Sequence, residues 1–211
     1  MPGSADELRA NGPSSADEAA PTDGPTPRTV APTLTDGVLR LRAWRQDDAP
    51  AVFAACQDAE IARWVPIPWP YHEPDAQSLI DASNTGWRDG TAAHFAMVDV
   101  ASNRVVGAIT RYGPDAARGG HRATFGYWVA AEARGRGVAT RALTLIVDWT
   151  LATSDVIRLD LETFAGNDAS AKVATRCGFE PEGTLRARYL HRGVPVDVVS
   201  YSRIRVAAKM A

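Results

Sequence analysis

A strand, a glycine-rich loop and a helix follow one another between residues 123 and 150, and this unit constrains the fold more than any other part of the chain. Residues 123–129 have the β-branched and aromatic composition of a strand. Residues 134–137 read Arg-Gly-Arg-Gly. Apolar residues then recur at the spacing of a helix face that lies on a sheet, at Val138, Ala142, Leu145, Ile146 and Trp149. The sequence therefore predicts a strand that leads through the loop into a helix.

The loop is expected to bind an anion. It places several backbone N–H groups at the positive end of the helix dipole. Gly135 and Gly137 let the backbone approach a ligand closely, and Arg134 and Arg136 can add charge-assisted contacts to phosphate oxygens. Phosphate or pyrophosphate is the ligand that this chemistry favours. An empty strand-to-helix turn with two solvated arginines is the alternative, which the loop alone leaves open.

Two other phosphate-binding loops can be tested on the sequence. A Walker loop is excluded because neither Gly-Lys-Ser nor Gly-Lys-Thr occurs in the chain. Residues 135–140 resemble a dinucleotide-binding fingerprint, with Asp160 or Glu162 about 20 residues further on. A doubly wound fold needs several further strand-helix units, however, and here one such unit is followed by a terminal hairpin. The order of elements therefore argues against a nicotinamide dinucleotide.

The hydrophobic pattern along the whole chain predicts a mixed sheet with helices on its faces. Strands are expected at 38–44, 94–98, 104–110, 123–129, 156–163, 184–190 and 195–204, and helices at 49–56, at 74–87, from 138 and at 168–177. The predicted fold class is α+β, with a central mixed, mostly antiparallel sheet flanked by about four helices.

Composition sets the expected domain boundaries. Residues 1–33 are rich in Pro, Ala, Ser, Asp, Gly and Thr and contain hardly a bulky apolar side chain. Burial of such a segment cannot offset the entropy of ordering it. We therefore expect a disordered tail over residues 1–33 and one folded domain over residues 34–206. A length of 211 residues suits one compact domain rather than two.

Charge and cysteine content limit the partners and the compartment. The formal net charge is -2 and the pI is near 6.1, which indicates neither nucleic acid nor an anionic membrane as a partner. Cys56 and Cys177 lack metal-ligand spacing, so we expect two buried thiols in a reducing compartment and no metal site. The chain has no run of roughly 20 apolar residues and no signal-peptide pattern. The expected location is the cytoplasm.

Several motifs resemble those of one family, the GCN5-related N-acetyltransferases (GNAT). Arg134-x-x-Gly137-x-Ala139 resembles the (Gln/Arg)-x-x-Gly-x-(Gly/Ala) loop with which that family binds acetyl-CoA. Further matches resemble its ribosomal-protein N-terminal (alanine/serine) acetyltransferase group, which is RimJ/RimL-like: Gly126-Tyr127-Trp128, Asn167-x-x-Ser170, Cys177-Gly178-Phe179, and Asp197 with Tyr201. The resemblance covers residues 34–205 in the element order that the family leads one to expect.

This resemblance implies an acetyltransferase that uses acetyl-CoA, or another acyl-CoA, as donor and a primary amine as acceptor. It also implies that the strand ending at Val129 diverges from the strand over 159–163, so that free backbone groups pair with pantetheine. The N–H at a bulge of the earlier strand, at Val129 or a neighbour, is expected to stabilise the oxyanion of the tetrahedral intermediate. The amine then attacks directly, without a covalent enzyme intermediate.

The resemblance implies that acyl-CoA binds to the strand end, the loop and the start of the last helix, at Trp128, Val129, Ala130, Arg134, Gly135, Arg136, Gly137, Val138, Ala139, Thr140, Asn167 and Ser170. Ser170 is also the expected acid. The alternative is that Asn167 caps the helix and Ser170 simply lies in its first turn. Lys172 and Arg176 on the same helix either meet the CoA phosphates or are solvated.

The proton acceptor is left open among several groups. Glu162, Asp197 and His94 are considered, with water relayed through backbone carbonyls as a fourth route. Glu162 is alternatively a solvated strand residue, and His94 a polar strand edge. The alternative for Asp197 is a buried carboxylate held by a backbone turn or by Arg186 or Arg188. Some relatives carry a glutamate where this chain has Arg188, which removes one base and adds basic charge near the acceptor site.

The acceptor is the least constrained part of the prediction. Residues 64–72, an aromatic and proline-rich loop, are placed to wall the acceptor pocket, and closing the core is the alternative. A protein N-terminus is the first expectation, followed by small amines that include amino sugars, because pocket loops set acceptor choice. A non-catalytic acyl-CoA-binding sensor is the hypothesis from another class. We expect a monomer or a homodimer.

Overall fold

One sheet carries the whole domain. The computed structural model describes residues 31–114 and 120–205. The strands in these ranges are β1 (Leu34–Thr35), β2 (Leu39–Arg42), β3 (Ala92–Asp99), β4 (Val105–Tyr112), β5 (Arg122–Val129), β6 (Arg158–Phe164), β7 (Glu180–His191) and β8 (Val194–Ile204). Their order is β1-β2-β3-β4-β5-β6-β8-β7, and β5 and β6 form the one parallel pair among the described strands. The predicted mixed, mostly antiparallel sheet is confirmed.

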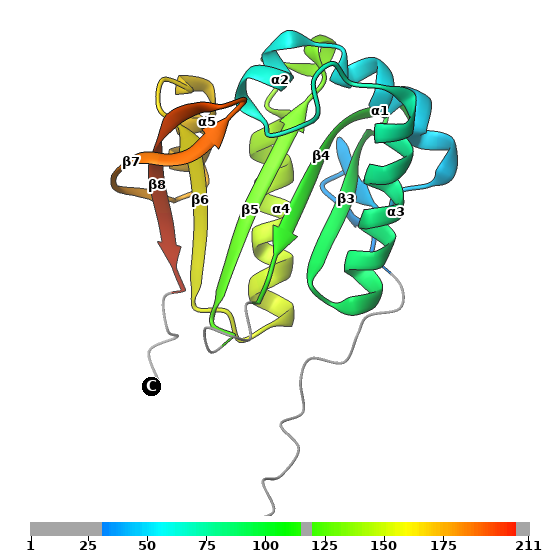
Figure 1. The fold of residues 1–211 in the computed structure, drawn as a ribbon. Coiled ribbons are helices and arrows are strands. Elements are labelled where there is room, and N and C mark those ends of the chain that lie inside the picture. The colour runs from blue at the N-terminus through cyan, green and yellow to red at the C-terminus, as the bar shows by residue number, and fades with distance from the viewer. Residues whose placement is uncertain (1–30, 115–119, 206–211) are drawn as a thin grey trace, which may run out of the picture.

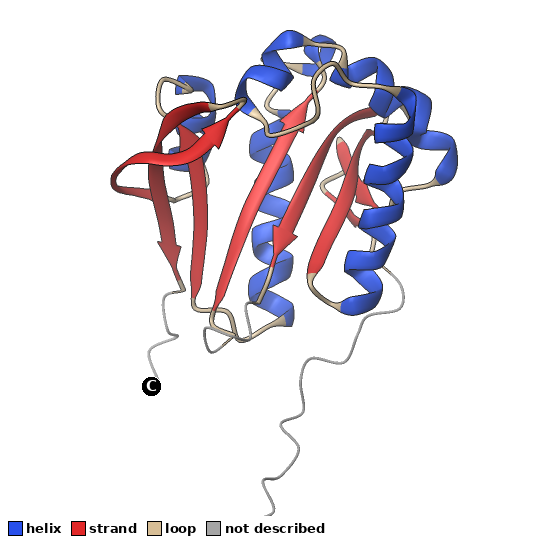
Figure 2. Ribbon diagram, viewed as in Figure 1, coloured by secondary structure: helices blue, strands red, loops and turns tan. Residues whose placement is uncertain are grey.

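Helices cover both faces of this sheet (Figures 1 and 2). α1 (Ala49–Cys56) and α3 (Glu73–Asp89) lie on one face, called the front face. α4 (Val138–Thr153) and α5 (Asp168–Arg176) lie on the other, called the back face. The short α2 (Ala59–Trp64) lies at the end of the sheet where β5 ends. The sequence predicts α1, α3, α4 and α5 but no helix at α2.

Local chemistry explains where the long helices begin and end. The backbone N–H of His72 donates to the Asp75 carboxylate at 2.7 Å, and Pro74 occupies the first turn of α3. α3 ends at Gly90, whose φ of 69° is in the left-handed region. α4 begins after Gly137, which has a φ of 76°. Glycine adopts this conformation without steric cost, so the chain turns from the loop straight into α4.

Each face of the sheet has its own hydrophobic core. The back-face core packs Leu143 and Ile146 of α4 against sheet residues such as Phe125. The front-face core packs α1 and α3 against the sheet and includes Val52 and Trp128. Phe125 and Trp128 of β5 therefore point to opposite faces of the sheet, one into each core.

β5 and β6 separate at one end of the sheet. Residues 122–125 of β5 pair with residues 158–161 of β6, and the described register between these strands stops there. β5 continues to Val129 and β6 continues to Phe164. The two strands thus form a V whose open end faces α2 (Figure 1). The divergence that the resemblance implies is present.

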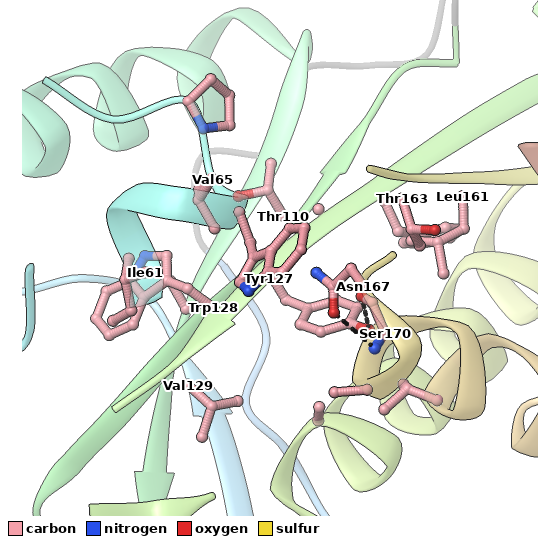
Figure 3. Close-up of a pocket in the computed structure, with 18 of the residues that line it drawn as sticks. Ile61, Val65, Thr110, Tyr127, Trp128, Val129, Leu161, Thr163, Asn167 and Ser170 are labelled. Atoms are coloured by element: carbon pink, nitrogen blue, oxygen red, sulfur yellow. Dashed lines mark hydrogen bonds between the residues drawn. The ribbon is translucent and has the colours of Figure 1, made fainter. Parts of the chain in front are cut away.

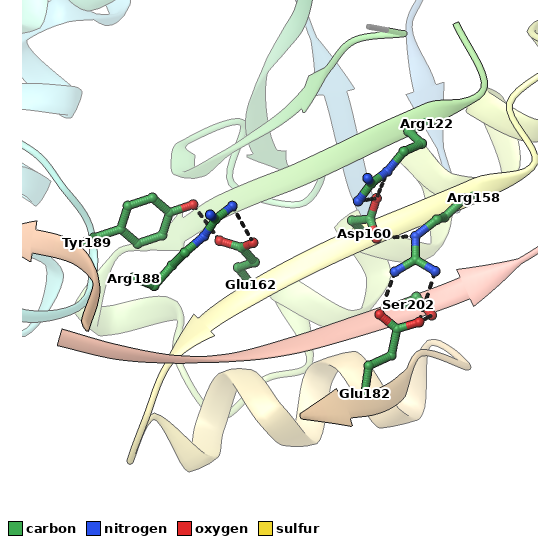
Figure 4. A network of polar contacts seen from close by, with 8 residues as sticks. All are labelled: Arg122, Arg158, Asp160, Glu162, Glu182, Arg188, Tyr189 and Ser202. Carbon is green, nitrogen blue, oxygen red and sulfur yellow. Dashed lines mark hydrogen bonds and ion pairs between the residues drawn. The ribbon is translucent and has the colours of Figure 1, made fainter. Parts of the chain in front are cut away.

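A charged network fixes the closed end of this V (Figure 4). The buried Asp160 carboxylate accepts hydrogen bonds from Arg122 at 2.9 Å and from Arg158 at 2.8 Å. Arg158 also donates to Glu182 at 2.9 Å, and the Ser202 hydroxyl donates to the same carboxylate at 2.7 Å. These two hydrogen bonds lower the pKa of Glu182 to about 2. The network ties β5, β6, β7 and β8 together where β5 and β6 still pair.

The chain outside the sheet and its helices is described only in part. Residues 1–30 of the predicted disordered tail, which was expected over residues 1–33, lie outside the described residues. The predicted domain end at residue 206 also lies outside them. Ala31 already packs against the back-face core. Among the described helices, none is both long enough and apolar enough to cross a lipid bilayer.

Candidate active site

A cavity of about 1070 Å³ occupies the open end of the V. Figure 3 shows β5, β6, α5 and the chain around α2 contributing side chains to it. Most residues predicted to bind acyl-CoA line this cavity: Trp128, Val129, Arg134, Gly135, Gly137, Val138, Ala139, Thr140, Asn167 and Ser170. Ala130 is buried outside the lining, and its N–H donates to Val106 O at 2.9 Å. The strand end, the loop and the last helix therefore meet at one site.

The glycine loop has the geometry of an anion site. Gly135 and Gly137 have φ angles of 73° and 76°, in the left-handed region that favours glycine. A Cβ atom at either position would meet nothing within 4 Å, so the loop backbone borders open space. Because Gly137 is the N-cap of α4, the free N–H groups of the first helical turn lie beside that space.

The two arginines of the loop are both ion-paired. Arg134 lines the cavity, contacts the Asp58 carboxylate at 2.5 Å and donates from Nε to Val129 O at 3.2 Å. Arg136 contacts Asp99 at 3.3 Å and does not line the cavity. The side chain of Arg136 is therefore directed away from the place predicted for the phosphates.

Alternate residues of β5 turn their backbone N–H and C=O groups toward β4 and toward the cavity. Residues 124–129 pair with β4 in unbroken register, and the N–H of Ala130 donates to Val106 O. Every second residue of an antiparallel strand bonds to its partner, so Tyr127 and Val129 turn their N–H groups to the opposite side, where β6 has diverged. The bulge expected at Val129 is not found in this register. The Val129 N–H therefore points into the cavity because of the regular strand pairing, and not because of a bulge.

Polar side chains gather where α5 begins. Asn167 Oδ1 accepts the N–H of Ser170 at 3.1 Å, so Asn167 caps the helix while also lining the cavity. Ser170 Oγ lies 2.7 Å from the Tyr127 hydroxyl (Figure 3). Burial raises the pKa of Tyr127 to about 12. Lys172 and Arg176 also line the cavity and add two cations to it.

Glu162 lines the cavity from β6, with its carboxylate held by β7 (Figure 4). It accepts a hydrogen bond from the Tyr189 hydroxyl and another from Arg188 at 3.3 Å. Burial raises the pKa of Tyr189, and the hydrogen bond to Glu162 raises it further. Tyr189 lines the cavity, whereas about half of the Arg188 side chain is exposed. Of the carboxylates considered as bases, Glu162 is placed in the site.

Asp197 lies outside the cavity lining and shapes β7 instead. Its Oδ1 accepts the N–H of Ala187 at 2.8 Å, and Ala187 has a left-handed φ of 48°. The register of β7 with β8 shifts just before Tyr189, so residues 186–188 form a bulge. This bulge immediately precedes the tyrosine that reaches Glu162. The Asp197 carboxylate is therefore held by a backbone turn, as in the alternative expected for it, but it is exposed rather than buried.

α2 joins the two arms of the V at its open end. The N-cap of α2, Asp58, pairs with Arg134 of the glycine loop. At the other end of α2, the Ala62 carbonyl accepts hydrogen bonds from His191 Nε2 at 3.0 Å and from Arg192 at 2.7 Å. His191 and Arg192 lie at the turn of the β7–β8 hairpin. The helix therefore links the loop on one arm to the hairpin on the other.

The predicted acceptor wall, residues 64–72, divides into lining and core. Residues 64–67 line the cavity. Tyr71 is buried in the front-face core, and Trp69 is half-exposed with the Arg192 guanidinium 5.2 Å above its ring. Both interpretations of this loop therefore apply, to different residues.

His94 lines the cavity from β3. Its Nδ1 lies 3.0 Å from the Thr110 hydroxyl, and burial lowers its pKa. Its ring packs on α3 at Gly86, where a Cβ atom would come within 3.0 Å of the imidazole. A neutral imidazole in close contact with α3 follows from these surroundings.

Neither a metal cluster nor a disulfide is found in the described residues. No group of three His, Cys, Asp or Glu side chains there is arranged to hold a metal ion. Cys56 and Cys177 are free and buried, as the sequence predicts. Burial raises the pKa of Cys56 to about 11, so this thiol stays protonated near neutral pH.

Sequence reasoning gives no role to three parts of the site. Tyr127 stands in a quoted motif, and strand alternation already places it on the face opposite Trp128, which was a usable signal. α2 is too short to show a helical period. The contact between Tyr189 and Glu162 depends on the bulge in β7, for which the sequence carries no clear local signal.

The comparisons with known proteins agree with this geometry. The acetyltransferase (GNAT) domain family matches residues 39–180. An uncharacterised N-acetyltransferase of Bacillus subtilis, YoaA, is 24% identical over 174 residues, 82% of this chain and 97% of the relative. The L-amino acid N-acetyltransferase AaaT of Escherichia coli is 32% identical over 101 residues, 48% of this chain and 62% of the relative. The solved structure of RimL, a ribosomal L7/L12 α-N-protein acetyltransferase in complex with coenzyme A, is similar with a TM-score of 0.70 at 22% identity, over 79% of this chain and 94% of that chain.

The family match covers more than half of the chain, and the structural likeness confirms the expected fold. The mixed sheet, with its single described parallel pair, also excludes the doubly wound dinucleotide fold. The chain belongs to the GNAT family of acetyltransferases, which move an acetyl group from acetyl-CoA to an amine.

Proposed function

We propose that this acetyltransferase modifies the α-amine at the N-terminus of a peptide or protein. The observation that carries this proposal is that apolar and aromatic side chains line the same cavity as Glu162. Ile61, Trp64, Val65 and Leu79 are among these side chains. A peptide end offers one ammonium group, followed by side chains and amides that can pack along such a lining.

The acidity of the amine supports an α-amine over a lysine side chain. Only a neutral amine attacks a thioester. An α-amine has a pKa near about 7.8 and a lysine near about 10.4, so at pH 7.5 the neutral fraction of the α-amine is roughly 250-fold larger. Glu162 already accepts hydrogen bonds from Arg188 and Tyr189. Hydrogen bonds that a carboxylate accepts make it a weaker base. Glu162 therefore suits an amine that loses its proton near neutral pH.

The donor half of the cavity supports acetyl-CoA as the acyl substrate. The diphosphate fits the N–H groups of the loop at the start of α4, with Lys172 and Arg176 as cations. The pantetheine amides fit backbone groups that Tyr127 turns away from β4, which leaves the Val129 N–H for the thioester carbonyl. Asn167, the N-cap of α5, lines the same cavity.

The proposed reaction needs three groups of the chain. The Val129 N–H stabilises the oxyanion as the amine nitrogen bonds to the acetyl carbon. The ammonium first loses one proton to water, and Glu162 takes the second proton, which the nitrogen loses as the amide forms. The carbon–sulfur bond then breaks with its electron pair on sulfur, and Ser170 lies at the leaving thiolate.

A free amino acid is the second acceptor that a specific observation favours. The Arg188 guanidinium lies 3.3 Å from Glu162, so a cation and an anion stand side by side at the acceptor end. A zwitterionic amino acid carries the complementary pair of charges. The partial match to an L-amino acid N-acetyltransferase supports the same candidate.

We also propose a cytoplasmic location. Two free, buried cysteines suit a reducing compartment, and no disulfide joins the described residues.

The test is a panel of amines with acetyl-CoA, read out as thiol release and as product mass. The panel holds a tetrapeptide with a free N-terminus, the same peptide with a blocked N-terminus and an internal lysine, a free amino acid, its amide, and an amino sugar. We expect the free peptide to exceed the blocked peptide by about 100-fold in kcat/KM, because the lysine amine is protonated.

Other outcomes point to other functions. Fastest turnover of the amino acid, with its amide much slower, would favour the zwitterion. Fastest turnover of the amino sugar would show that the cavity selects small amines. Binding of CoA with no thiol release on any amine would indicate an acyl-CoA sensor and contradict the proposal.

A further inference from the structure

Tyr127 of β5 and Ser170 of α5 share a hydrogen bond inside the cavity. Their hydroxyl oxygens are 2.7 Å apart, and both residues line the cavity. Figure 3 shows the ring of Tyr127 reaching toward the first turn of α5. The ring packs against the back-face core, which holds it in place. The pair therefore spans the gap between the strand that carries the Val129 N–H and the helix that carries Asn167.

The direction of this hydrogen bond follows from the two hydroxyls. A phenol is a stronger donor than an aliphatic alcohol, and burial, which raises the pKa of Tyr127 to about 12, keeps the phenol protonated at neutral pH. Either hydroxyl could donate in this 2.7 Å contact, and because the phenol is the stronger donor, Tyr127 is assigned as the donor and Ser170 Oγ as the acceptor. The Ser170 backbone N–H is already bonded to Asn167. Among the described residues, none accepts the hydroxyl proton of Ser170, which is left to point into the cavity.

We propose that Tyr127 is a positioning residue that turns the Ser170 hydroxyl toward the sulfur of bound CoA. This inference rests on the proposed function, because it concerns the leaving group of the same reaction. The nitrogen–carbon bond forms, the carbon–sulfur bond breaks, and the electron pair stays on sulfur. The amine proton passes to Glu162. Ser170 donates a hydrogen bond to the thiolate, and Tyr127 keeps its own proton throughout.

The consequence is a more acidic thiol in the bound product. A hydrogen bond donated to a charged group stabilises the charged form. The thiol of CoA bound to the wild-type protein is therefore expected to be about tenfold more acidic than that of free CoA. A residue that only fills space in the back-face core would not change this acidity.

The experiment titrates bound CoA by the ultraviolet absorbance of its thiolate, with desulfo-CoA as the blank. The proteins are wild type, Tyr127→Phe, Ser170→Ala and the double variant. We expect each single variant to remove most of the extra acidity and the double variant to remove no more, because both act on one hydrogen bond. Each is expected to lower kcat about tenfold or more, with little change in KM for acetyl-CoA.

Tyr71→Phe is the matched control. Tyr71 is also a buried tyrosine, but it belongs to the front-face core and does not line the cavity. It is expected to leave the thiol acidity and kcat unchanged.

Two results would overturn the proposal. One is a wild-type bound thiol no more acidic than free CoA. The other is a folded Tyr127→Phe variant with wild-type acidity and kcat. Should this variant not fold, equal thiol acidity in wild type and Ser170→Ala overturns the proposal by itself. The titration needs no acceptor, so a failed amine panel would contradict the proposed acceptor without touching the role of Tyr127.

Discussion

Glu162 and Asp197 are carboxylates on paired neighbouring strands, and their surroundings give them different tasks. Glu162 lines the cavity and meets a tyrosine hydroxyl and a guanidinium. Asp197 is exposed and bonded to the backbone of a bulge. We propose that Glu162 meets the amine, whereas Asp197 holds the backbone of the bulge in β7.

Glu162→Gln is expected to lower kcat about 100-fold at neutral pH, since it removes the group that we propose takes the amine proton. The KM for acetyl-CoA should stay the same, because Glu162 is on the acceptor side of the cavity. Asp197→Asn keeps an Oδ1 acceptor for the Ala187 N–H and should retain nearly wild-type kcat. Steady-state kinetics of the two variants check this. A large loss in Asp197→Asn with none in Glu162→Gln would reverse the assignment.

Residue positions differ in how far the sequence predicts them. Asn167 and Ser170 follow from their place at the start of a helix, and Gly135 and Gly137 from their place between strand and helix. These are local signals. The partners of Glu162 are not local, because Tyr189 stands 27 residues further along the chain and reaches Glu162 only through the bulge. The sequence therefore predicts the donor side of the site better than the acceptor side.

Among the secondary-structure elements, α2 bridges the two arms of the V at its open end. It pairs with the glycine loop through Asp58 and with the β7–β8 hairpin through the Ala62 carbonyl. The other helices show a cap or an apolar period in the sequence, and α1 lies where it was predicted, at Ala49–Cys56. α2 has only the six residues Ala59–Trp64, fewer than two turns, so no period was available to predict it.

Arg192→Ala tests the link between α2 and the hairpin. Loss of a hydrogen bond from a charged donor costs about 1.5–3 kcal/mol, so the hairpin should leave α2 more often and the KM for the acceptor should rise about tenfold. Binding of acetyl-CoA should change less than about twofold, because the glycine loop is on the other arm. The measurements are acceptor KM and calorimetric titration of acetyl-CoA.

Arg88→Ala is the control for this variant. Arg88 is an exposed arginine of α3 that pairs with Asp89 at 3.2 Å. An unchanged acceptor KM in Arg192→Ala, or an equal rise in Arg88→Ala, would show that the hairpin contact does not shape the acceptor site.

In the molecule as a whole, β5 and β6 pair at one end of the sheet and separate at the other. The Asp160 network holds β5 and β6 together, and the pairing stops after residue 125 of β5. The element order read from the sequence predicts this sheet well, because hydrophobic patterns extend over whole strands. The hydrophobic pattern does not predict where β5 and β6 separate. That separation was expected only from the family resemblance.

We propose that the glycine loop at the start of α4 binds the diphosphate of CoA in the open V. Gly137→Asp places a carboxylate there. A charge about 5 Å from a diphosphate at an effective dielectric constant of about 20 is worth several kcal/mol, so CoA affinity should fall by roughly 100-fold or more.

Gly37→Asp is the matched control. Gly37 has a similar left-handed φ of 85° and open space around its Cβ direction, but it lies in the β1–β2 turn, outside the cavity lining. The measurement is calorimetric titration of CoA into wild type and both variants, each checked for its melting temperature. We expect Gly137→Asp alone to lose CoA binding while remaining folded. Wild-type affinity in a folded Gly137→Asp protein would contradict it.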